Sequence, residues 1–261
     1  MIKSLFFFLL LFTFKIPLNG QNIHYSSSNV HSHNDYEQDL PFYAAYARGF
    51  GSIEADLWAV DGELYVAHHR SEIEEDRTFQ YLYLDPLLRQ IRFNKGKAYP
   101  DGKKLQLLID LKSPYHEALP ILLRQLDPYR HYFDLNKNTD AIRLVISGQM
   151  PPPDRLHTYD SILTFDGRPE IEYPEKDWER VVLISANVQN FISWNKQESI
   201  SGEKKIMLQE IIDEIHRKDR LIRFWAVPDT ENSYEILMDL GVDYIGTDDP
   251  EKIECLLRWR K

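Results

Sequence analysis

The 261-residue chain is long enough for one large domain, and its 31 basic and 41 acidic residues give a formal net charge of −10. Such a surface repels polyanions, so we expect no nucleic-acid partner and no attraction to anionic membranes. Cys255 is the only cysteine, which excludes an intrachain disulfide, and we expect it to fill a small space in the core.

Residues 1–20 have the features of a secretory signal. A basic start precedes an apolar run over residues 5–14, which is too short to cross a bilayer, and residues 17–20 include turn-forming types. We therefore expect cleavage near Gly20, export to the periplasm or the medium, and no stable membrane anchor. The mature chain, residues 21–261, would then be a single domain with 29 basic and 41 acidic residues.

The mature chain alternates apolar, β-branched runs with segments of helical periodicity. The runs predict eight main strands, which begin near residues 30, 52, 106, 143, 162, 182, 222 and 244. A further run at residues 64–67 follows the Asp61-Gly62 turn. Helices are predicted over residues 40–48, 86–93, 116–126, 204–218 and 233–240.

This alternation is typical of an α/β protein with a parallel sheet. Eight units in this length favour a closed (β/α)₈ TIM barrel over an open doubly wound sheet. No glycine-rich dinucleotide or phosphate loop follows any predicted strand.

Carboxylates and imidazoles gather where the first predicted strands end. Glu54 and Asp56 are two residues apart, so on a strand both side chains share one face. Asp110 ends the next parallel strand, His33 ends the first, and His68 follows the run at residues 64–67. Because barrel active sites lie at the carboxyl ends of the strands, these residues predict a metal site flanked by acid–base groups, as in a hydrolase.

In these motifs the chain resembles the phospholipase-C-like phosphodiesterase superfamily, which includes glycerophosphodiester phosphodiesterases, sphingomyelinase D-type enzymes and phosphatidylinositol-specific phospholipases C. The His-Ser-His-Asn-Asp-Tyr opening at residues 31–36 is closest to the altered-inheritance-of-mitochondria group. The shared features are a histidine ending strand one, Glu-x-Asp ending strand two, a histidine shortly after Asp-Gly, and an acidic-x-Lys pair ending strand three. The segment 240–250 is similar to the closing strand of the superfamily.

The resemblance implies a role for each of these positions. Glu54, Asp56 and Asp110 would hold one divalent cation, and an oxygen-only donor set suits Mg²⁺ or Ca²⁺ better than zinc. His33 and His68 would divide the acid–base work, with the base and the acid not yet distinguished. We expect alanine at any one of the three carboxylates to abolish turnover and leave the fold intact.

Four residues are candidates for substrate contact. Lys112 would reach a phosphate oxygen as a point charge, Asn34 stands beside the first catalytic histidine, and Trp225 lies on the seventh predicted strand. His31 shares a strand face with His33, and a structural hydrogen bond is the favoured alternative for it.

Two other functional classes remain open. His31-x-His33 could provide metal ligands, as in barrel metal hydrolases of the amidohydrolase or polymerase-and-histidinol-phosphatase type, although the fifth and sixth strands lack the further histidines these need. A non-catalytic lipid- or glycan-binding barrel would have no use for the full carboxylate–histidine set. The resemblance implies a phosphodiester of the glycerol, inositol or sugar type as the substrate. Because Asn34 and Asp35 stand where glycerophosphodiesterases usually carry Arg-Gly, the alcohol stays unspecified. Whether the product is a linear or a cyclic phosphate, and the oligomeric state, also stay open.

Overall fold

The computed structural model describes residues 24–195 and 199–259. The predicted signal segment, residues 1–20, lies outside the described residues. Within the described part of the chain, no helix is long and apolar enough to cross a membrane.

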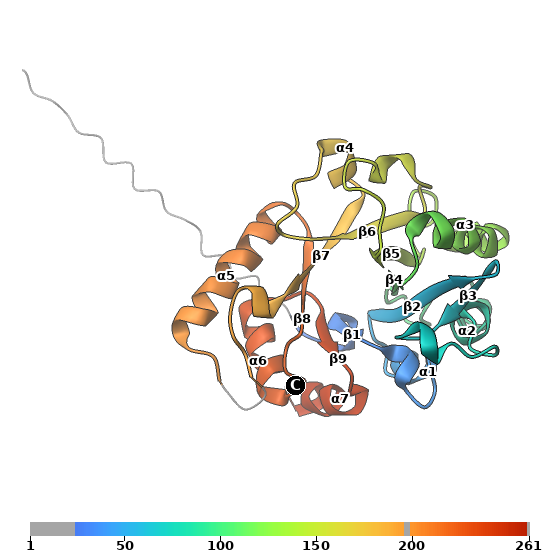
Figure 1. Ribbon diagram of the computed structural model, residues 1–261. Coiled ribbons are helices and arrows are strands. Elements are labelled where there is room, and N and C mark those ends of the chain that lie inside the picture. The colour runs from blue at the N-terminus through green and yellow to red at the C-terminus, as the bar shows by residue number, and fades with distance from the viewer. Residues whose placement is uncertain (1–23, 196–198, 260–261) are drawn as a thin grey trace, which may run out of the picture.

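The centre of the molecule is a parallel sheet of eight strands that is nearly closed into a barrel, with helices around its outside (Figure 1). The strands are β1 (Val30–Ser32), β2 (Ser52–Val60), β4 (Gln106–Leu111), β5 (Arg143–Gly148), β6 (Leu163–Gly167), β7 (Val181–Asn187), β8 (Leu221–Trp225) and β9 (Ile245–Thr247). Their order is β8-β7-β6-β5-β4-β2-β1-β9, and a single bridge between Arg223 and Tyr244 links the two edge strands. The eight predicted strands and the barrel are thereby confirmed.

The ninth strand, β3 (Glu63–Val66), pairs antiparallel with β2 across the Asp61-Gly62 turn. It belongs to a hairpin beside the barrel and not to the barrel wall. The hairpin carries the chain from the end of β2 back along that strand to the level of Asp56, which is how His68 comes close to Asp56.

The helices are α1 (Tyr43–Tyr46), α2 (Asp85–Phe93), α3 (Tyr115–Leu126), α4 (Glu175–Trp178), α5 (Gly202–Arg217), α6 (Glu231–Leu240) and α7 (Pro250–Trp259). Short 3₁₀ turns cover Ser27–Asn29, Asp35–Glu37, Arg70–Glu72, Asp127–Tyr132, Leu156–Thr158 and Val188–Asn190, and a π-helical turn covers Gln80–Leu84. The predicted helix over residues 40–48 is shorter than expected, because Phe42 adopts a positive φ of 64° directly before α1.

The core lies between the barrel wall and the helices, while a small apolar layer of Leu108, Val145 and Leu183 fills the barrel interior. Cys255 is not part of the core. In α7 the buried positions are Ile253, Leu256 and Leu257, and Cys255 lies on the opposite, exposed side of that helix. The expectation that it fills the core is wrong, because a helix turns about 100° per residue and its apolar stripe passes this position by.

Candidate functional site

Three carboxylates meet at the carboxyl end of β4 and on the neighbouring stretch of β2, which continues beyond them to Val60. Oxygens of Glu54, Asp56 and Asp110 all lie within 4.8 Å of one another. Asp56 and Asp110 are direct register partners in the parallel pair, which places their side chains next to each other on the inner face. The clustering predicted from the strand ends is therefore present.

The cluster fits a divalent cation. Asp56 is fully buried, and its Oδ1 atom has no hydrogen-bond partner among the described residues. Burial and the charge of Glu54 raise the pKa of Asp56 to about 6, and burial together with Glu54 also raises the pKa of Asp110. An unpartnered buried carboxylate oxygen beside two further carboxylates is the environment in which a hard cation replaces missing donors and relieves the charge repulsion.

Gly148 leaves room for Asp110. It has a positive φ of 70°, and a Cβ atom at this position would lie 2.1 Å from Asp110 Oδ1. Backbone conformation and space therefore both require glycine where β5 ends beside the cluster.

Glu54 is also the partner of a buried arginine. The Nη1 atom of Arg223 on β8 donates to Glu54 Oε2 at 3.1 Å and contacts His31 Nε2, while Arg223 Nε donates to Ser185 Oγ at 3.2 Å. Glu54 is 3% exposed and Arg223 6%. Although burial acts in the opposite direction, the His31 hydrogen bond and the charges of His33 and Arg223 hold the pKa of Glu54 below its usual range.

His31 has a structural position. It is fully buried, with Nδ1 2.8 Å from Ser52 Oγ and Nε2 2.7 Å from Glu54 Oε2. Burial and the charge of Arg223 lower the pKa of His31 to about 4, so the ring is neutral at neutral pH. Both ring nitrogens are engaged within the protein, and the carboxylate cluster includes no histidine among the described residues. This arrangement offers no support for the alternative in which His31 and His33 are metal ligands.

The Glu54–Arg223 pair leads to a prediction about stability. Arg223→Met should lower the free energy of unfolding by about 3–5 kcal/mol, because the buried Glu54 carboxylate loses its cation. Chemical denaturation followed by circular dichroism measures this change. Arg258→Met removes an exposed Arg–Glu pair and should cost less than about 1 kcal/mol; equal losses in the two variants would contradict the assignment.

The two predicted catalytic histidines approach different carboxylates of the cluster, His33 approaching Glu54 and His68 approaching Asp56. His33 Nδ1 is 2.7 Å from Asp248 Oδ1, and His33 Nε2 is 4.0 Å from Glu54 Oε1. Despite burial, the hydrogen bond that His33 donates to Asp248 and the charge of Glu54 raise the pKa of His33. His68 Nδ1 lies 3.3 Å from Asp56 Oδ2.

The remaining candidates border the same region. Lys112 Nζ lies 3.0 Å from Asp56 Oδ2 and 3.5 Å from Asp110 Oδ2. Asn34 donates through Nδ2 to Asp248 Oδ1 at 3.3 Å. Trp225 is 41% exposed and lines a pocket, so it is not a core residue.

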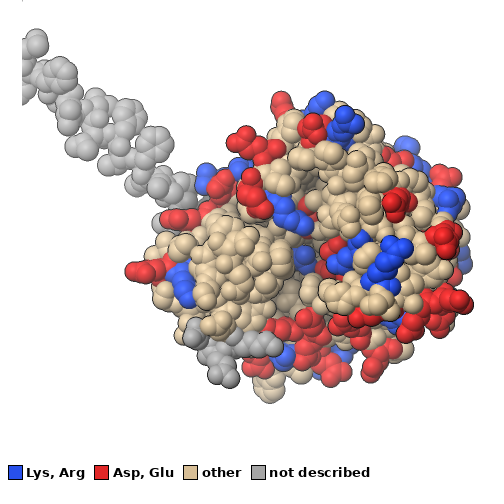
Figure 2. Space-filling view, viewed as in Figure 1, with Lys and Arg blue, Asp and Glu red and all other residues tan. Residues whose placement is uncertain are grey.

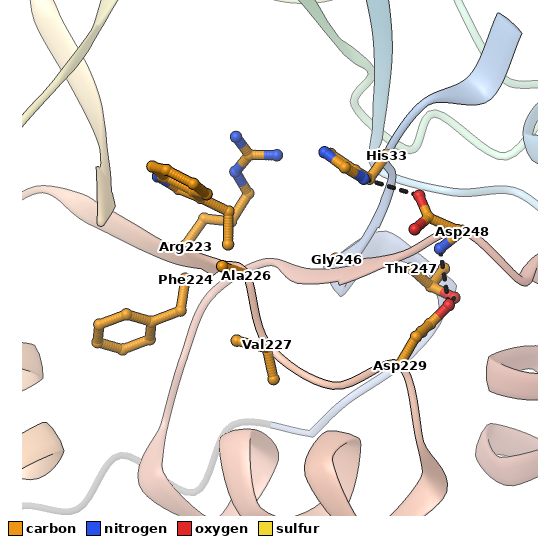
Figure 3. A pocket seen from close by; sticks show the side chains of 10 residues that line it. His33, Arg223, Phe224, Ala226, Val227, Asp229, Gly246, Thr247 and Asp248 are labelled. Carbon is orange, nitrogen blue, oxygen red and sulfur yellow. Dashed lines mark hydrogen bonds and ion pairs between the residues drawn. The ribbon is translucent and has the colours of Figure 1, made fainter. Parts of the chain in front are cut away.

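This pocket has a volume of about 120 Å³ and opens beside His33. One side is formed by His33 and Asp248, and the other by Arg223, Phe224 and Ala226 (Figure 3). In the space-filling view, basic and acidic side chains lie close together around a hollow near the middle of the face (Figure 2).

Sequence reasoning missed four residues of this region: Tyr36, Asp248, Arg223 and Arg168. Tyr36 Oη lies 2.6 Å from Asp56 Oδ2 and 2.7 Å from Asn34 Oδ1. Arg168 Nη1 pairs with the buried Asp166 at 2.9 Å on β6. Two signals were available, because Asp248 directly follows the last strand and Arg223 is a charged residue inside an apolar strand.

A family model and the curated relatives of this chain indicate the same family. A model of the AIM6-like phosphodiesterase domain matches residues 22–152, half of the chain. Altered inheritance of mitochondria protein 6 from Eremothecium gossypii is 29% identical over 267 residues, covering 87% of this chain and 68% of that protein. The protein of the same name from Saccharomyces cerevisiae is 30% identical over 265 residues, covering 84% and 68%.

Two solved structures share the fold. A glycerophosphodiester phosphodiesterase from Parabacteroides distasonis superimposes with a TM-score of 0.54 at 16% identity, covering 89% of this chain and 97% of that chain. A glycerophosphodiester phosphodiesterase from Agrobacterium tumefaciens superimposes with a TM-score of 0.51 at 15% identity, covering 88% of this chain and 95% of that chain. The barrel predicted from the sequence is the barrel of these proteins.

Proposed function

The chain belongs to the AIM6-like phosphodiesterase domain family, and from this premise we propose that it is a metal-dependent phosphoric diester hydrolase. One observation supports this most strongly: three clustered carboxylates, one with an unpartnered buried oxygen, lie beside two histidines whose Nδ1 atoms are each held by a carboxylate.

Glu54, Asp56 and Asp110 would hold the cation, and their oxygen-only donor set suits Mg²⁺ or Ca²⁺. When bound, it supplies positive charge that neutralises the phosphate and the charge that develops on it during hydrolysis. Lys112 adds a second positive charge beside Asp56 and Asp110, within reach of a phosphate oxygen at the same edge.

In this proposal, His33 and His68 transfer the protons. Asp248 accepts the Nδ1 proton of His33, which leaves Nε2 directed at the cluster as the nitrogen that exchanges a proton. His68 lies beside Asp56, with Nδ1 3.3 Å from its Oδ2 atom. Phosphodiester hydrolysis requires one group that activates the nucleophile and one that protonates the leaving oxygen, and two histidines beside different carboxylates could supply both.

The proposed substrates are soluble phosphodiesters of the glycerol, inositol or sugar type, met outside the cytoplasm if residues 1–20 direct export. The small pocket beside His33 and the acidic net charge support small polar alcohols over acyl chains and anionic bilayers.

A phosphodiester panel tests this function. Purified protein with added Mg²⁺ or Ca²⁺ should hydrolyse glycerophosphodiesters or sugar phosphodiesters faster than phospholipid in vesicles, as measured by release of the alcohol and of phosphomonoester. Rapid hydrolysis of vesicle phospholipid with little turnover of soluble diesters would contradict the substrate class. Hydrolysis of none of these with either ion would contradict the proposed reaction.

A further inference from the structure

A continuous chain of hydrogen bonds joins the two candidate catalytic histidines. His33 Nδ1 lies 2.7 Å from Asp248 Oδ1, which also accepts from Asn34 Nδ2 at 3.3 Å. The other end of the same amide, Asn34 Oδ1, lies 2.7 Å from Tyr36 Oη, and Tyr36 Oη is 3.0 Å from His68 Nδ1. One asparagine and one tyrosine therefore connect groups beside different carboxylates of the cluster.

The protons along this chain can be assigned from the acceptors. Tyr36 has one hydroxyl proton and two oxygens that only accept, Asn34 Oδ1 and Asp56 Oδ2 at 2.6 Å, so it donates to one of them at a time. The chain is complete when this proton goes to Asn34, and Lys112 Nζ at 3.0 Å then donates to Asp56 Oδ2. His68 Nδ1 therefore meets the Tyr36 oxygen and Asp56 Oδ2 without a proton available from either, so it must donate. The same argument puts a proton on His33 Nδ1, because the Asp248 carboxylate accepts only. Both imidazoles then keep Nε2 free for proton exchange.

The turn that carries Asn34 is firmly fixed. Asn34 has a left-handed backbone with φ of 45°, which asparagine tolerates better than most residues. The next residue, Asp35, is fully buried and accepts from Ser32 Oγ at 2.8 Å, the Phe42 amide at 2.6 Å and Tyr83 Oη at 3.0 Å. These bonds hold the segment between His33 and Tyr36 in one conformation, so the amide of Asn34 has a defined direction.

We propose that Asn34 and Tyr36 are positioning residues that join the His33–Asp248 pair to the His68–Asp56 pair and fix both imidazoles as Nδ1–H tautomers. The catalytic meaning of this bridge rests on the proposed function, whereas the bridge itself is a property of the fold. It gives Asn34 a role different from direct substrate contact, since both ends of its amide are engaged within the protein.

The experiment changes one bridging residue at a time and records the ring signals of the histidine at the other end of the bridge. In ¹⁵N-histidine-labelled protein at alkaline pH, above the raised pKa of His33, nuclear magnetic resonance should show neutral Nδ1–H tautomers for His33 and His68. Asn34→Gly, which accepts the positive φ and deletes the amide, should shift the ring signals of the distant His68. Tyr36→Phe, which deletes only a hydroxyl, should shift those of His33.

Tyr99→Phe is the matched control, because Tyr99 is also buried and donates its hydroxyl to a backbone carbonyl, that of Phe50, at 2.6 Å. It should move neither histidine. An Nε2–H tautomer in the wild type, or variants that affect only the nearer histidine, would overturn the bridge.

Kinetics provide a second, separate test. Each variant should lower kcat by about 10–100-fold with little change in KM, as outer partners of catalytic groups do. The double variant should lose no more turnover than the less active of the two single variants, because both substitutions interrupt the same chain of hydrogen bonds. Losses of turnover that multiply in the double variant would contradict the bridge. A wild-type protein without any turnover would count against the proposed function alone, since the tautomer measurement decides the bridge without activity.

Discussion

Asp110→Asn should reduce phosphodiester turnover at least about 10³-fold and leave the fold unchanged. The variant keeps the shape of the side chain but removes the charge of one of the three proposed anionic ligands, and the charge stabilisation supplied by a catalytic cation is worth several kcal/mol. Asp110 is the suitable position because it is only partly buried, and its ion-pair partner Lys112 also keeps some exposure, at 23%. Turnover at saturating Mg²⁺ or Ca²⁺, calorimetric titration of the ion and thermal unfolding measure the three quantities.

Asp140→Asn is the matched control, since Asp140 forms only surface ion pairs with Lys97 and Lys104. It should retain wild-type turnover and ion affinity. Full activity of the wild type in excess EDTA, or of Asp110→Asn without added ion, would show that the carboxylates do not serve a cation.

For Glu54, the ion pair with Arg223 argues against the expectation that alanine at any of the three carboxylates leaves the fold intact. Glu54 is the only carboxylate partner of the buried Arg223 among the described residues. Removing it strands a guanidinium in the barrel interior, a loss of about 3–5 kcal/mol. An inactive Glu54→Ala protein would therefore not separate a lost ligand from a lost fold, whereas Asp110→Asn does.

His68→Ala should lose activity selectively, according to the leaving group. If His68 protonates the departing oxygen, turnover of a substrate with an alkyl leaving group should fall about 10²–10⁴-fold, the usual contribution of general acid catalysis. A nitrophenyl diester should lose far less, because nitrophenolate departs without a proton. Steady-state kinetics on the two substrates give the ratio of the losses.

His69→Ala is the control for this substitution. His69 is the neighbouring imidazole, in ring contact with His68 at 4.6 Å, and its backbone amide caps a short turn through Glu72. This variant should lower the turnover of both substrates only slightly and by the same factor. Equal, large losses for His68→Ala on both substrates would assign His68 to activation of the nucleophile.

The local sequence pattern by itself determined the strands of this protein and the position of its carboxylate cluster. Apolar runs and helical periodicity predicted eight strands in the right places, because a barrel wall buried on both faces needs apolar residues throughout. The two-residue spacing of Glu54 and Asp56 and the strand end at Asp110 predicted the cluster, since parallel strands end at one edge and the side chains alternate between faces. The motifs around His33, His68 and Lys112 indicated the family.

Tertiary structure alone decided what surrounds these groups. Arg223 reaches Glu54 from β8, 169 residues away, and Asp248 reaches His33 across 215 residues. Periodicity states which face a residue occupies and where its strand ends, but barrel closure and side-chain rotamers determine which partner it meets. For the same reason the sequence could place Tyr36 only next to a motif, whereas the fold puts its one hydroxyl between Asn34, Asp56 and His68.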